Sequence, residues 1–217
     1  MKVTIICSDS IHPVYPYLER WIKKNIKSHD ISIYSSITNI EKGGDILFLI
    51  SCSEIVKKPI RDMFRYTLVL HASDLPEGRG WSPHIWDIIN GKNTLVLSLL
   101  NAEDGVDTGD IWQKRLITLD GSELYEEINH KVFEAELGLM SWACENIDNS
   151  EAIPQDIQNG RSDYHRKRIP EDSQLSLDKS IEDQFNLLRV CDSNRFPAYI
   201  IRNGQRYNIK LEKVNDE

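Results

Sequence analysis

Residues 67–100 read TLVLHASDLPEGRGWSPHIWDIINGKNTLVLSLL. The two apolar ends of this stretch, 67–70 and 93–100, have the composition of strands that are buried on both faces. Between them, Ser82-Pro83 is typical of a helix start, with serine as the N-cap and proline at the first helical position. Gly91 is the kind of residue that closes such a helix. The stretch therefore predicts a strand, a long loop, a helix and a second strand.

The same alternation of strands and helices continues on both sides of this stretch. Apolar runs predict further strands, and helical spacing or helix-start signals predict further helices. The strands are expected at 2–7, 31–35, 45–51 and 111–119, and the helices at 16–27, at 58–64 and from the capping-box-like Asp120–Glu123 to Asn146. This alternation favours an α/β fold with a mostly parallel sheet that helices cover.

The composition changes near residue 149. Residues 149–179 are polar, and a helix is expected over 180–190. Asn203-Gly204 then supplies the two left-handed residues of a β-hairpin turn. We therefore predict a main domain over 1–148 and a small C-terminal α+β appendage over 149–217 that ends in the hairpin.

The charge and the cysteines restrict the class of protein. The chain has 217 residues and a formal net charge of −8, whereas proteins that grip nucleic acid by its phosphates usually have a basic surface. We therefore expect no nucleic-acid partner. The four cysteines form no CxxC pair, which argues against zinc and redox sites and indicates reduced thiols in a cytoplasmic protein. The first apolar run is too short for a membrane span or a signal sequence, so no membrane partner is expected.

Two reactive side chains follow strands of the predicted sheet. In open α/β sheets, ligands bind beyond the carboxyl ends of the strands. Loops are expected there after Cys7, after Leu70 and over the acidic residues 102–110. Two of these loops carry His71 and Asp107, which the sheet can bring together. No metal is expected, because the acidic loop lacks the distal glutamate of an EF-hand.

The motifs around these two residues resemble those of a known family. The pattern comprises His71, Ser73, Leu75-Pro76, Arg79-Gly80, Pro83 and Trp86, followed by DTGDI at 107–111. It is similar to the pattern of the 10-formyltetrahydrofolate-dependent formyltransferases, and two separated motifs in order are more specific than one. The resemblance implies a Rossmann-like sheet (the formyltransferase fold) and 10-formyltetrahydrofolate as formyl donor. The segment that begins YHRKRIPEDS at Tyr164 resembles enzymes that formylate amino sugars on nucleotide carriers.

The resemblance implies catalytic roles for His71 and Asp107. An imidazole aimed at the formyl oxygen stabilises the negative charge of a tetrahedral intermediate. A carboxylate beside it orients the ring and can relay the proton of the attacking amine. The family usually has an asparagine two positions before the histidine, where this chain has Val69, which donates no hydrogen bond. Ser73, a backbone N–H of the 71–80 loop or another asparagine are alternative donors.

The resemblance also implies where two ligands bind. The folate is expected against Ser51, Cys52, Ser53, Ile55, Val56, Ile60, Asn101, Glu103 and Gly105. The nucleotide sugar is expected against Ser8, Asp9, Ser10, His12, Ser73, Arg79, Gly80, Tyr164, Arg166, Arg168 and Arg189. Arginines enter this set because a guanidinium fork suits a diphosphate. By contrast, His84 and His130 are interpreted as surface or packing residues.

We therefore expect an N-formyltransferase that acts on the amine of a nucleotide-linked amino-deoxysugar for surface glycans. The favoured acceptor is a UDP-4-amino-4,6-dideoxy-HexNAc of a pseudaminic-type pathway. A dTDP-amino sugar or a carrier-bound aminoacyl group is an alternative, and methionyl-tRNA is disfavoured by the acidic charge and the short C-terminal part. A second hypothesis, a non-catalytic module that binds folate or a nucleotide sugar, follows from Val69. The protein is expected to be a monomer or a homodimer, because an exposed hairpin edge can recruit a partner.

Overall fold

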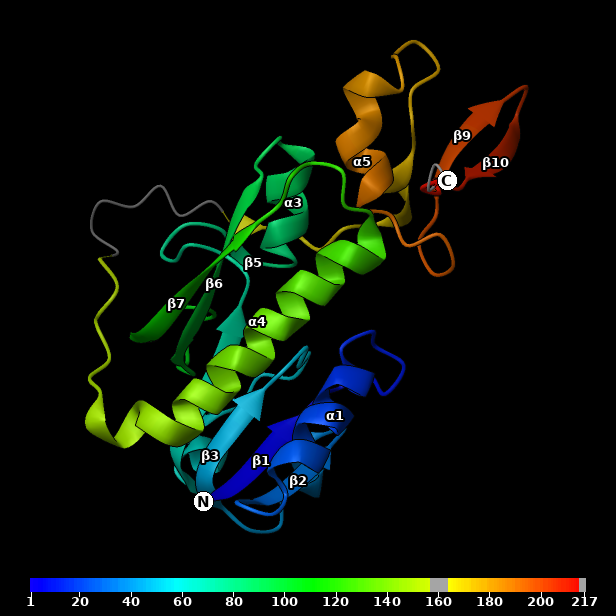
Figure 1. The fold of residues 1–217 in the computed structure, drawn as a ribbon. Coiled ribbons are helices and arrows are strands. Elements are labelled where there is room, and N and C mark those ends of the chain that lie inside the picture. Colours follow the sequence, from blue (N-terminus) through cyan, green and yellow to red (C-terminus); the bar gives the residue numbers. More distant parts are fainter. Residues whose placement is uncertain (157–163, 215–217) are drawn as a thin grey trace.

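The computed structural model describes residues 1–156 and 164–214. Its centre is a six-stranded sheet in the order β2-β1-β3-β4-β6-β7 (Figure 1). The strands are β1 Lys2–Ile6, β2 Asp30–Tyr34, β3 Gly44–Leu49, β4 Phe64–His71, β6 Thr94–Asn101 and β7 Ile111–Thr118. The first four run parallel to one another, whereas β6 and β7 are antiparallel to their neighbours. The predicted mostly parallel α/β sheet is confirmed.

Helices cover both faces of this sheet. The α-helices of the described residues are α1 Tyr15–Asn25, α2 Lys58–Arg61, α3 Pro83–Ile89, α4 Tyr125–Asn146 and α5 Phe185–Arg189. Short 3₁₀ turns lie at Ile37–Asn39, Ile147–Asn149, Pro170–Ser173 and Glu182–Gln184. Apolar side chains of α1, α3 and α4 pack with the strands in one large core, and Figure 1 shows α4 lying across the sheet. A smaller apolar cluster on the other face packs the strands against the α2 region.

The long helix α4 follows the predicted spacing. Ile128, Phe133, Leu137 and Met140 are buried, as their roughly helical spacing predicts. The helix begins later than the capping-box pattern at 120–123 indicated. Glu123 closes a turn of its own by accepting the N–H groups of Asp120 and Gly121. The first turn of the helix is instead stabilised by Glu127, which accepts the N–H of Leu124.

The helix α3 starts and stops where the sequence indicates, but for a partly different reason. Pro83 is its first residue, and Gly91 lies just beyond its end with φ of 89°. Ser82 does not act as a side-chain cap. Its backbone is left-handed, with φ of 47°, and its hydroxyl makes no cap hydrogen bond. The proline and the turn before it therefore set the start of the helix.

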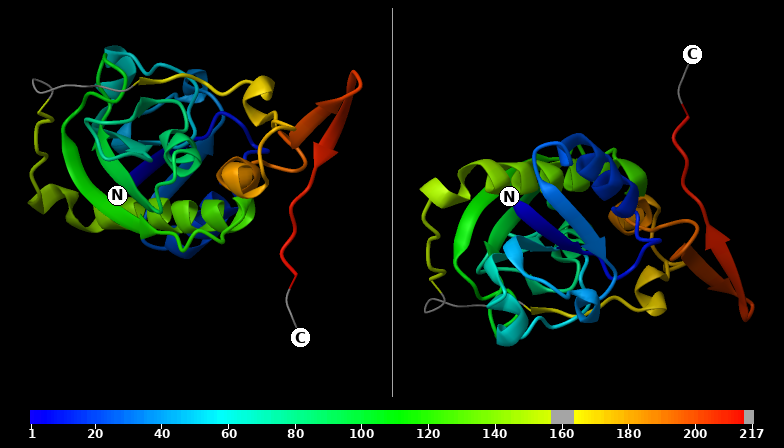
Figure 2. Two further views of the ribbon diagram at one scale, coloured as in Figure 1. Left: turned by 90° about the horizontal axis from the view of Figure 1, so that it is seen from above. Right: turned by 90° about the horizontal axis from the view of Figure 1, so that it is seen from below.

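The C-terminal part forms a second, small core. The strands β9 Ala198–Arg202 and β10 Gln205–Ile209 pair as the predicted hairpin, with left-handed Asn203 and Gly204 at its turn. Leu175, Leu188 of α5 and Ala198 of the hairpin are buried together in this core. The expected helix over 180–190 is split into a 3₁₀ turn and α5. Both views of Figure 2 show the hairpin projecting from one end of the molecule.

Several contacts tie this part to the main body, among them a short strand pairing and a buried arginine. The short strand β5 Arg79–Gly80 pairs in parallel with β8 Tyr164–His165. In addition, Arg189 is 1% exposed and donates to the backbone oxygen of Glu123. The division into 1–148 and 149–217 stays a prediction, and its second part includes the residues 157–163 and 215–217, which lie outside the described ranges.

Candidate active site

Two side chains from distant parts of the chain meet on the sheet face that carries α2. His71 is the last residue of β4, and Asp107 belongs to the loop between β6 and β7. Nδ1 of His71 lies 3.5 Å from Oδ1 of Asp107, and the two side chains are 9% and 8% exposed. The pair is thus largely withdrawn from water, where electrostatic interactions are stronger than at the surface.

Asp107 reaches His71 by a route that the sequence did not indicate. β6 runs antiparallel to β4, with Ser98 beside His71 and the end of β6 beside Leu68. The loop 102–110 therefore leaves the sheet well before the level of His71 and folds back along β4 to reach it. The prediction that this loop follows the carboxyl end of a strand parallel to β4 is wrong. The expected approach of His71 and Asp107 is nevertheless present.

Backbone groups hold Asp107 in place. Its φ is 57°, a left-handed value that aspartate adopts more readily than most residues other than glycine. Oδ2 accepts the N–H of Gly80 at 3.0 Å, and its backbone oxygen accepts Nε2 of Gln155, also at 3.0 Å. Gly80 has φ of 97°, and a Cβ there would lie 2.4 Å from the oxygen of His165. Only glycine fits at position 80, and its N–H holds the carboxylate of Asp107 in place.

The second nitrogen of His71 is engaged by a backbone carbonyl. Nε2 lies 2.9 Å from the oxygen of Gly78. Because a carbonyl oxygen only accepts, Nε2 carries a proton in this arrangement. The imidazole therefore presents a donor at Nε2, with the Asp107 carboxylate behind it at Nδ1. A substrate oxygen in the place of the Gly78 carbonyl would accept a hydrogen bond from the Nε2–H of His71.

The position of the family asparagine is apolar. Val69 packs in the cluster of Leu49, Val56 and other apolar side chains on this face. Ser73, one of the predicted alternative donors, is 2% exposed and its Oγ has no hydrogen-bond partner. Its backbone oxygen accepts the hydroxyl of Ser98 at 2.7 Å. Ser73 is thus fixed by its backbone and keeps a free buried hydroxyl.

A second histidine, His84, is interpreted from the sequence as a surface or packing residue. His84 is the second residue of α3, and its Nδ1 is buried without a hydrogen-bond partner. Burial, together with the charges of His71 and His12, lowers the pKa of His84 to about 4. It is therefore neutral near pH 7.

The loop after β1 meets the loop after β3. Nε2 of His12 lies 3.4 Å from Oγ of Ser51, and the N–H of Ser53 donates to Oγ of Ser8 at 3.0 Å. Burial lowers the pKa of His12, the charge of Arg195 lowers it further, and that of Asp9 acts in the opposite sense. The structure therefore brings together a segment predicted to bind the acceptor and one predicted to bind folate.

The other predicted folate residues differ in exposure, and they do not all lie on one face of the sheet, because Asn101 bonds to Trp112, which packs against the large core. Val56 is buried, Ile60 and Cys52 are partly buried against the smaller cluster, and Ile55 is 68% exposed. Asn101 accepts Nε1 of Trp112 at 2.7 Å through Oδ1, so its side-chain oxygen is already used.

Arg61, which the sequence did not single out, links the two loops of this group. It donates to the oxygen of Val56 and to Asp104, both at 2.8 Å, and lies 3.8 Å from Glu103. Gly105 lies within the same loop, where its oxygen accepts Oγ1 of Thr108.

The arginines predicted to bind a diphosphate have partners inside the protein. Arg166 forms a two-pronged pair with Asp172, at 2.6 and 2.5 Å. Arg168 donates to the backbone oxygen of Asp172 and to Ser173, both at 3.2 Å. Arg189 is buried, 3.8 Å from Glu123. Its place in the interior argues against the predicted contact with a ligand, because a ligand would have to displace the packing of α5.

The remaining acceptor residues occupy two places. Arg79 is partly buried, and its Nε and Nη2 have no partner, while Tyr164 beside it is 57% exposed. Ser10 is exposed on the loop after β1, where Arg195 pairs with Asp9 at 3.3 Å. The sequence did not single out Arg195, because a lone arginine has no motif around it.

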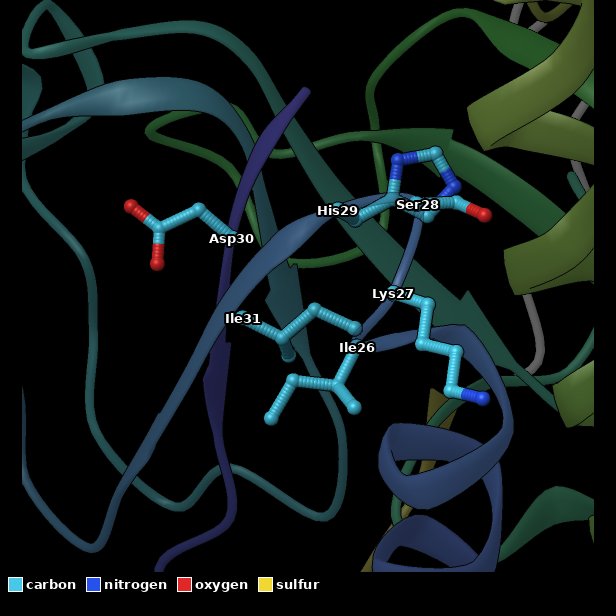
Figure 3. Close-up of a pocket in the computed structure, with 6 residues that line it drawn as sticks. All are labelled: Ile26, Lys27, Ser28, His29, Asp30 and Ile31. Carbon is cyan, nitrogen blue, oxygen red and sulfur yellow. The ribbon is translucent and has the colours of Figure 1, made fainter.

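The described residues contain no group of three or more histidine, cysteine, aspartate or glutamate side chains that could hold a metal ion. Within the same ranges, no helix is both long and apolar enough to cross a membrane. A hollow lined by residues 26–31 lies between α1 and β2 (Figure 3). It sits where β2 begins, at the edge opposite the carboxyl ends of the parallel strands, so it does not belong to the site.

Comparison with known proteins gives consistent results. No protein-family model matches the chain. The methionyl-tRNA formyltransferase of Agathobacter rectalis is 31% identical over 211 residues, which cover 90% of this chain and 66% of that protein. That of Clostridium beijerinckii is 26% identical over 209 residues, covering 90% and 67%. The chain thus spans about two thirds of the length of these relatives.

Solved structures share the fold. Methionyl-tRNA formyltransferase from Clostridium thermocellum superposes with a TM-score of 0.80 at 22% identity, covering 99% of this chain and 94% of that chain. A 4-N formyltransferase from Francisella tularensis gives 0.75 at 17%, covering 98% of each. HypX from Aquifex aeolicus, in complex with tetrahydrofolic acid, gives 0.75 at 16%, covering 97% of this chain and 37% of that one.

Proposed function

The chain belongs to the formyltransferase family, and from that premise we propose that it is an enzyme that moves the formyl group of 10-formyltetrahydrofolate to the amine of a nucleotide-linked amino-deoxysugar. The favoured acceptor is a UDP-4-amino-4,6-dideoxy-HexNAc, and the product is a formamido sugar for surface glycans. The observation that carries the proposal is the buried His71–Asp107 pair, 3.5 Å apart, with a proton donor at Nε2.

The residues around the pair suit a folate. Val56, Ile60 and Val69 form an apolar wall on the face that also carries His71. Beside this wall, Ser73 keeps a buried hydroxyl without a partner. Such a wall with few polar groups is typical of small-molecule sites. When bound, 10-formyltetrahydrofolate supplies an activated formyl carbon.

The side chains of the pair then have distinct tasks. With the formyl oxygen in the place of the Gly78 carbonyl, the Nε2–H of His71 would donate to the oxygen that becomes negative, and the carboxylate of Asp107 would orient the ring. Removal of one such donor typically lowers the rate by about 10²–10³. Ser73 Oγ is the second donor that this chain offers in place of the family asparagine.

The nature of the acceptor follows from charge and from the fold relatives. The net charge of −8 favours a small acceptor over tRNA, because tRNA binding needs a basic surface. Solved neighbours described as sugar N-formyltransferases share the fold over the whole of this chain. Because the curated relatives carry the name methionyl-tRNA formyltransferase, methionyl-tRNA is the competing acceptor to test.

A turnover assay separates these possibilities. The protein is mixed with 10-formyltetrahydrofolate and, separately, with UDP- and dTDP-4-amino-4,6-dideoxy sugars and methionyl-tRNA. We expect a mass gain of one formyl group on a UDP-amino sugar, abolished in His71→Ala. Formylation of methionyl-tRNA alone would refute the proposed acceptor. Binding of folate and sugar without any product would instead support the non-catalytic module that Val69 suggests.

A further inference from the structure

Outside the His71–Asp107 pair, one carboxyl group has a buried oxygen that finds no hydrogen-bond partner among the described residues. Glu136 lies in the middle of α4, and its Oε2 is buried without a hydrogen bond. Phe133, one turn earlier, and Met140, one turn later, are both buried, so Glu136 lies along the inward face of the helix. A buried polar group without a partner costs about 1–3 kcal/mol. An apolar side chain would avoid that cost, which points to a ligand as the missing partner.

The position of Glu136 relates it to the predicted acceptor loop. Its charge acts on Cys7, which directly follows β1. The ring of Phe133 contacts that of His12 edge to face, with centroids 6.0 Å apart. Glu136 therefore stands below the loop after β1. β3 lies between β1 and β4 in the sheet, so the ends of β1 and β4 are roughly 10 Å apart at the usual strand spacing. Glu136 approaches this edge from the face that α4 covers, whereas His71 lies on the face that carries α2.

The other titratable groups near the reaction site are poorly suited to accept a proton from an ammonium group. One oxygen of Asp107 accepts the N–H of Gly80, and the other lies 3.5 Å from Nδ1 of His71. His71 must keep its proton to act as a donor. His84 has a pKa of about 4, which makes it a very weak base. His12 already accepts the N–H of Val14 through Nδ1.

The groups that face Glu136 leave it without a compensating charge. Cys7 comes from the end of β1, and its thiol, with a pKa raised by burial to about 11, is neutral. Arg115 of β7 contacts α4 at Gly138, and Arg20 of α1 pairs with Glu134 on the exposed side. Burial raises the pKa of Glu136 to about 8. A group with such a pKa is well matched to exchange a proton with an amine near neutral pH.

We propose that Glu136 binds the ammonium group of the acceptor and takes the proton that the nitrogen must lose before it attacks. This inference rests on the proposed function. The ionised carboxylate removes one proton from the acceptor R–NH₃⁺. The resulting amine forms a bond to the formyl carbon, and the bond from that carbon to N10 of the folate breaks. The second proton of the nitrogen passes to N10, and Glu136 releases the first to solvent.

The first test is kinetic, with a UDP-4-amino-4,6-dideoxy-N-acetylhexosamine and 10-formyltetrahydrofolate as substrates. Glu136→Gln keeps the shape and removes the base, so kcat/KM for the acceptor should fall by about 10² or more, while KM for the folate stays within twofold. In the wild type kcat/KM should rise with pH up to about 8, and Glu136→Gln should lack this rise. The matched control is Glu134→Gln, two residues away on the exposed face, which should change kcat/KM by less than twofold.

A second test uses the wild-type protein and needs no turnover. Titration calorimetry of the same sugar in two buffers of different ionisation enthalpy measures proton release. Because Glu136 is mostly protonated at pH 7, pairing with an ammonium group should release close to one proton, and Glu134→Gln should do the same. Binding without proton release, or Glu136→Gln with unaltered kcat/KM and pH profile, would overturn the role of Glu136. Proton release by a wild type that forms no formyl product would instead refute the proposed function and leave the ammonium site standing.

Discussion

The His71 region and the C-terminal segment both contain charged residues that the sequence singled out, but the two regions use their charges differently. At the His71 region, Asp107 lies against a histidine whose other nitrogen meets only a backbone carbonyl that a substrate can replace. In the C-terminal segment, Arg166 and Arg189 face acidic groups of the protein itself. From this difference we expect a ligand to contact charged side chains of the His71 region rather than Arg166 or Arg189.

The largest expected effect tests the first region. Asp107→Asn keeps the shape of the side chain but removes the charge that stabilises a positive His71. We expect kcat to fall by about 10²–10⁴, with the unfolding midpoint nearly unchanged, because an amide oxygen can still accept the N–H of Gly80. Steady-state formyl transfer and thermal unfolding measure the two quantities. Near-wild-type turnover would mean that the charge of Asp107 does not serve the reaction, and the contrast with the C-terminal arginines would be lost.

Arg189→Met tests the opposite region. The substitution removes hydrogen bonds to Asn93 and to the backbone of Glu123 but keeps an apolar stem. Loss of one partner from a buried charged network should lower the free energy of unfolding by about 2–3 kcal/mol. Urea unfolding gives this value. The KM for the sugar acceptor, measured on the folded protein, should stay within twofold, whereas a tenfold rise would show that Arg189 does contact the substrate.

The pH dependence of unfolding tests whether the ring of His84, near the His71 region, is buried. Its folded pKa is about 4, below the ordinary value of 6.5. The unfolded chain therefore binds a proton first as the pH falls, so the stability contributed by the neutral ring is complete above pH 6.5 and is lost from there toward pH 4. One pH unit corresponds to about 1.4 kcal/mol. Between pH 7 and 5.5, urea unfolding should show the wild type losing about 1 kcal/mol more than His84→Gln, and equal losses would contradict the burial of this ring.

The smallest effect belongs to Arg166→Ala. The arginine is 60% exposed, and its pair with Asp172 lies at the surface. Such pairs contribute about 0–1 kcal/mol, so the unfolding free energy should change by less than 1 kcal/mol. The acceptor KM should remain within twofold in the same assay as for Arg189. A large rise in KM would mean that the ligand exchanges places with Asp172 and that the two regions act alike.

The sequence predicted the elements more reliably than their ends and caps. Strands of β-branched and leucine residues were found because burial on both faces needs continuous apolar runs. The left-handed backbone of Ser82 was not predicted, because a serine before proline has several turn geometries and only packing selects this one. In the site, the motif identified His71 and Asp107, whereas Arg61, His84 and Glu136 lack a pattern in the chain and become visible only through their neighbours.

The sequence by itself determined the alternating α/β fold, the hairpin and the two residues of the His71–Asp107 pair, since each depends on local composition or on a motif. Only the tertiary structure decided that β6 runs antiparallel, that the loop 102–110 folds back along β4, and which charged groups have partners. The physical reason is that burial and pairing are properties of several segments at once. The free energy of an arginine or glutamate depends on whether an opposite charge from elsewhere in the chain lies within a few ångströms. Arg189 has Glu123 at 3.8 Å, whereas the buried Oε2 of Glu136 has no hydrogen-bond partner among the described residues.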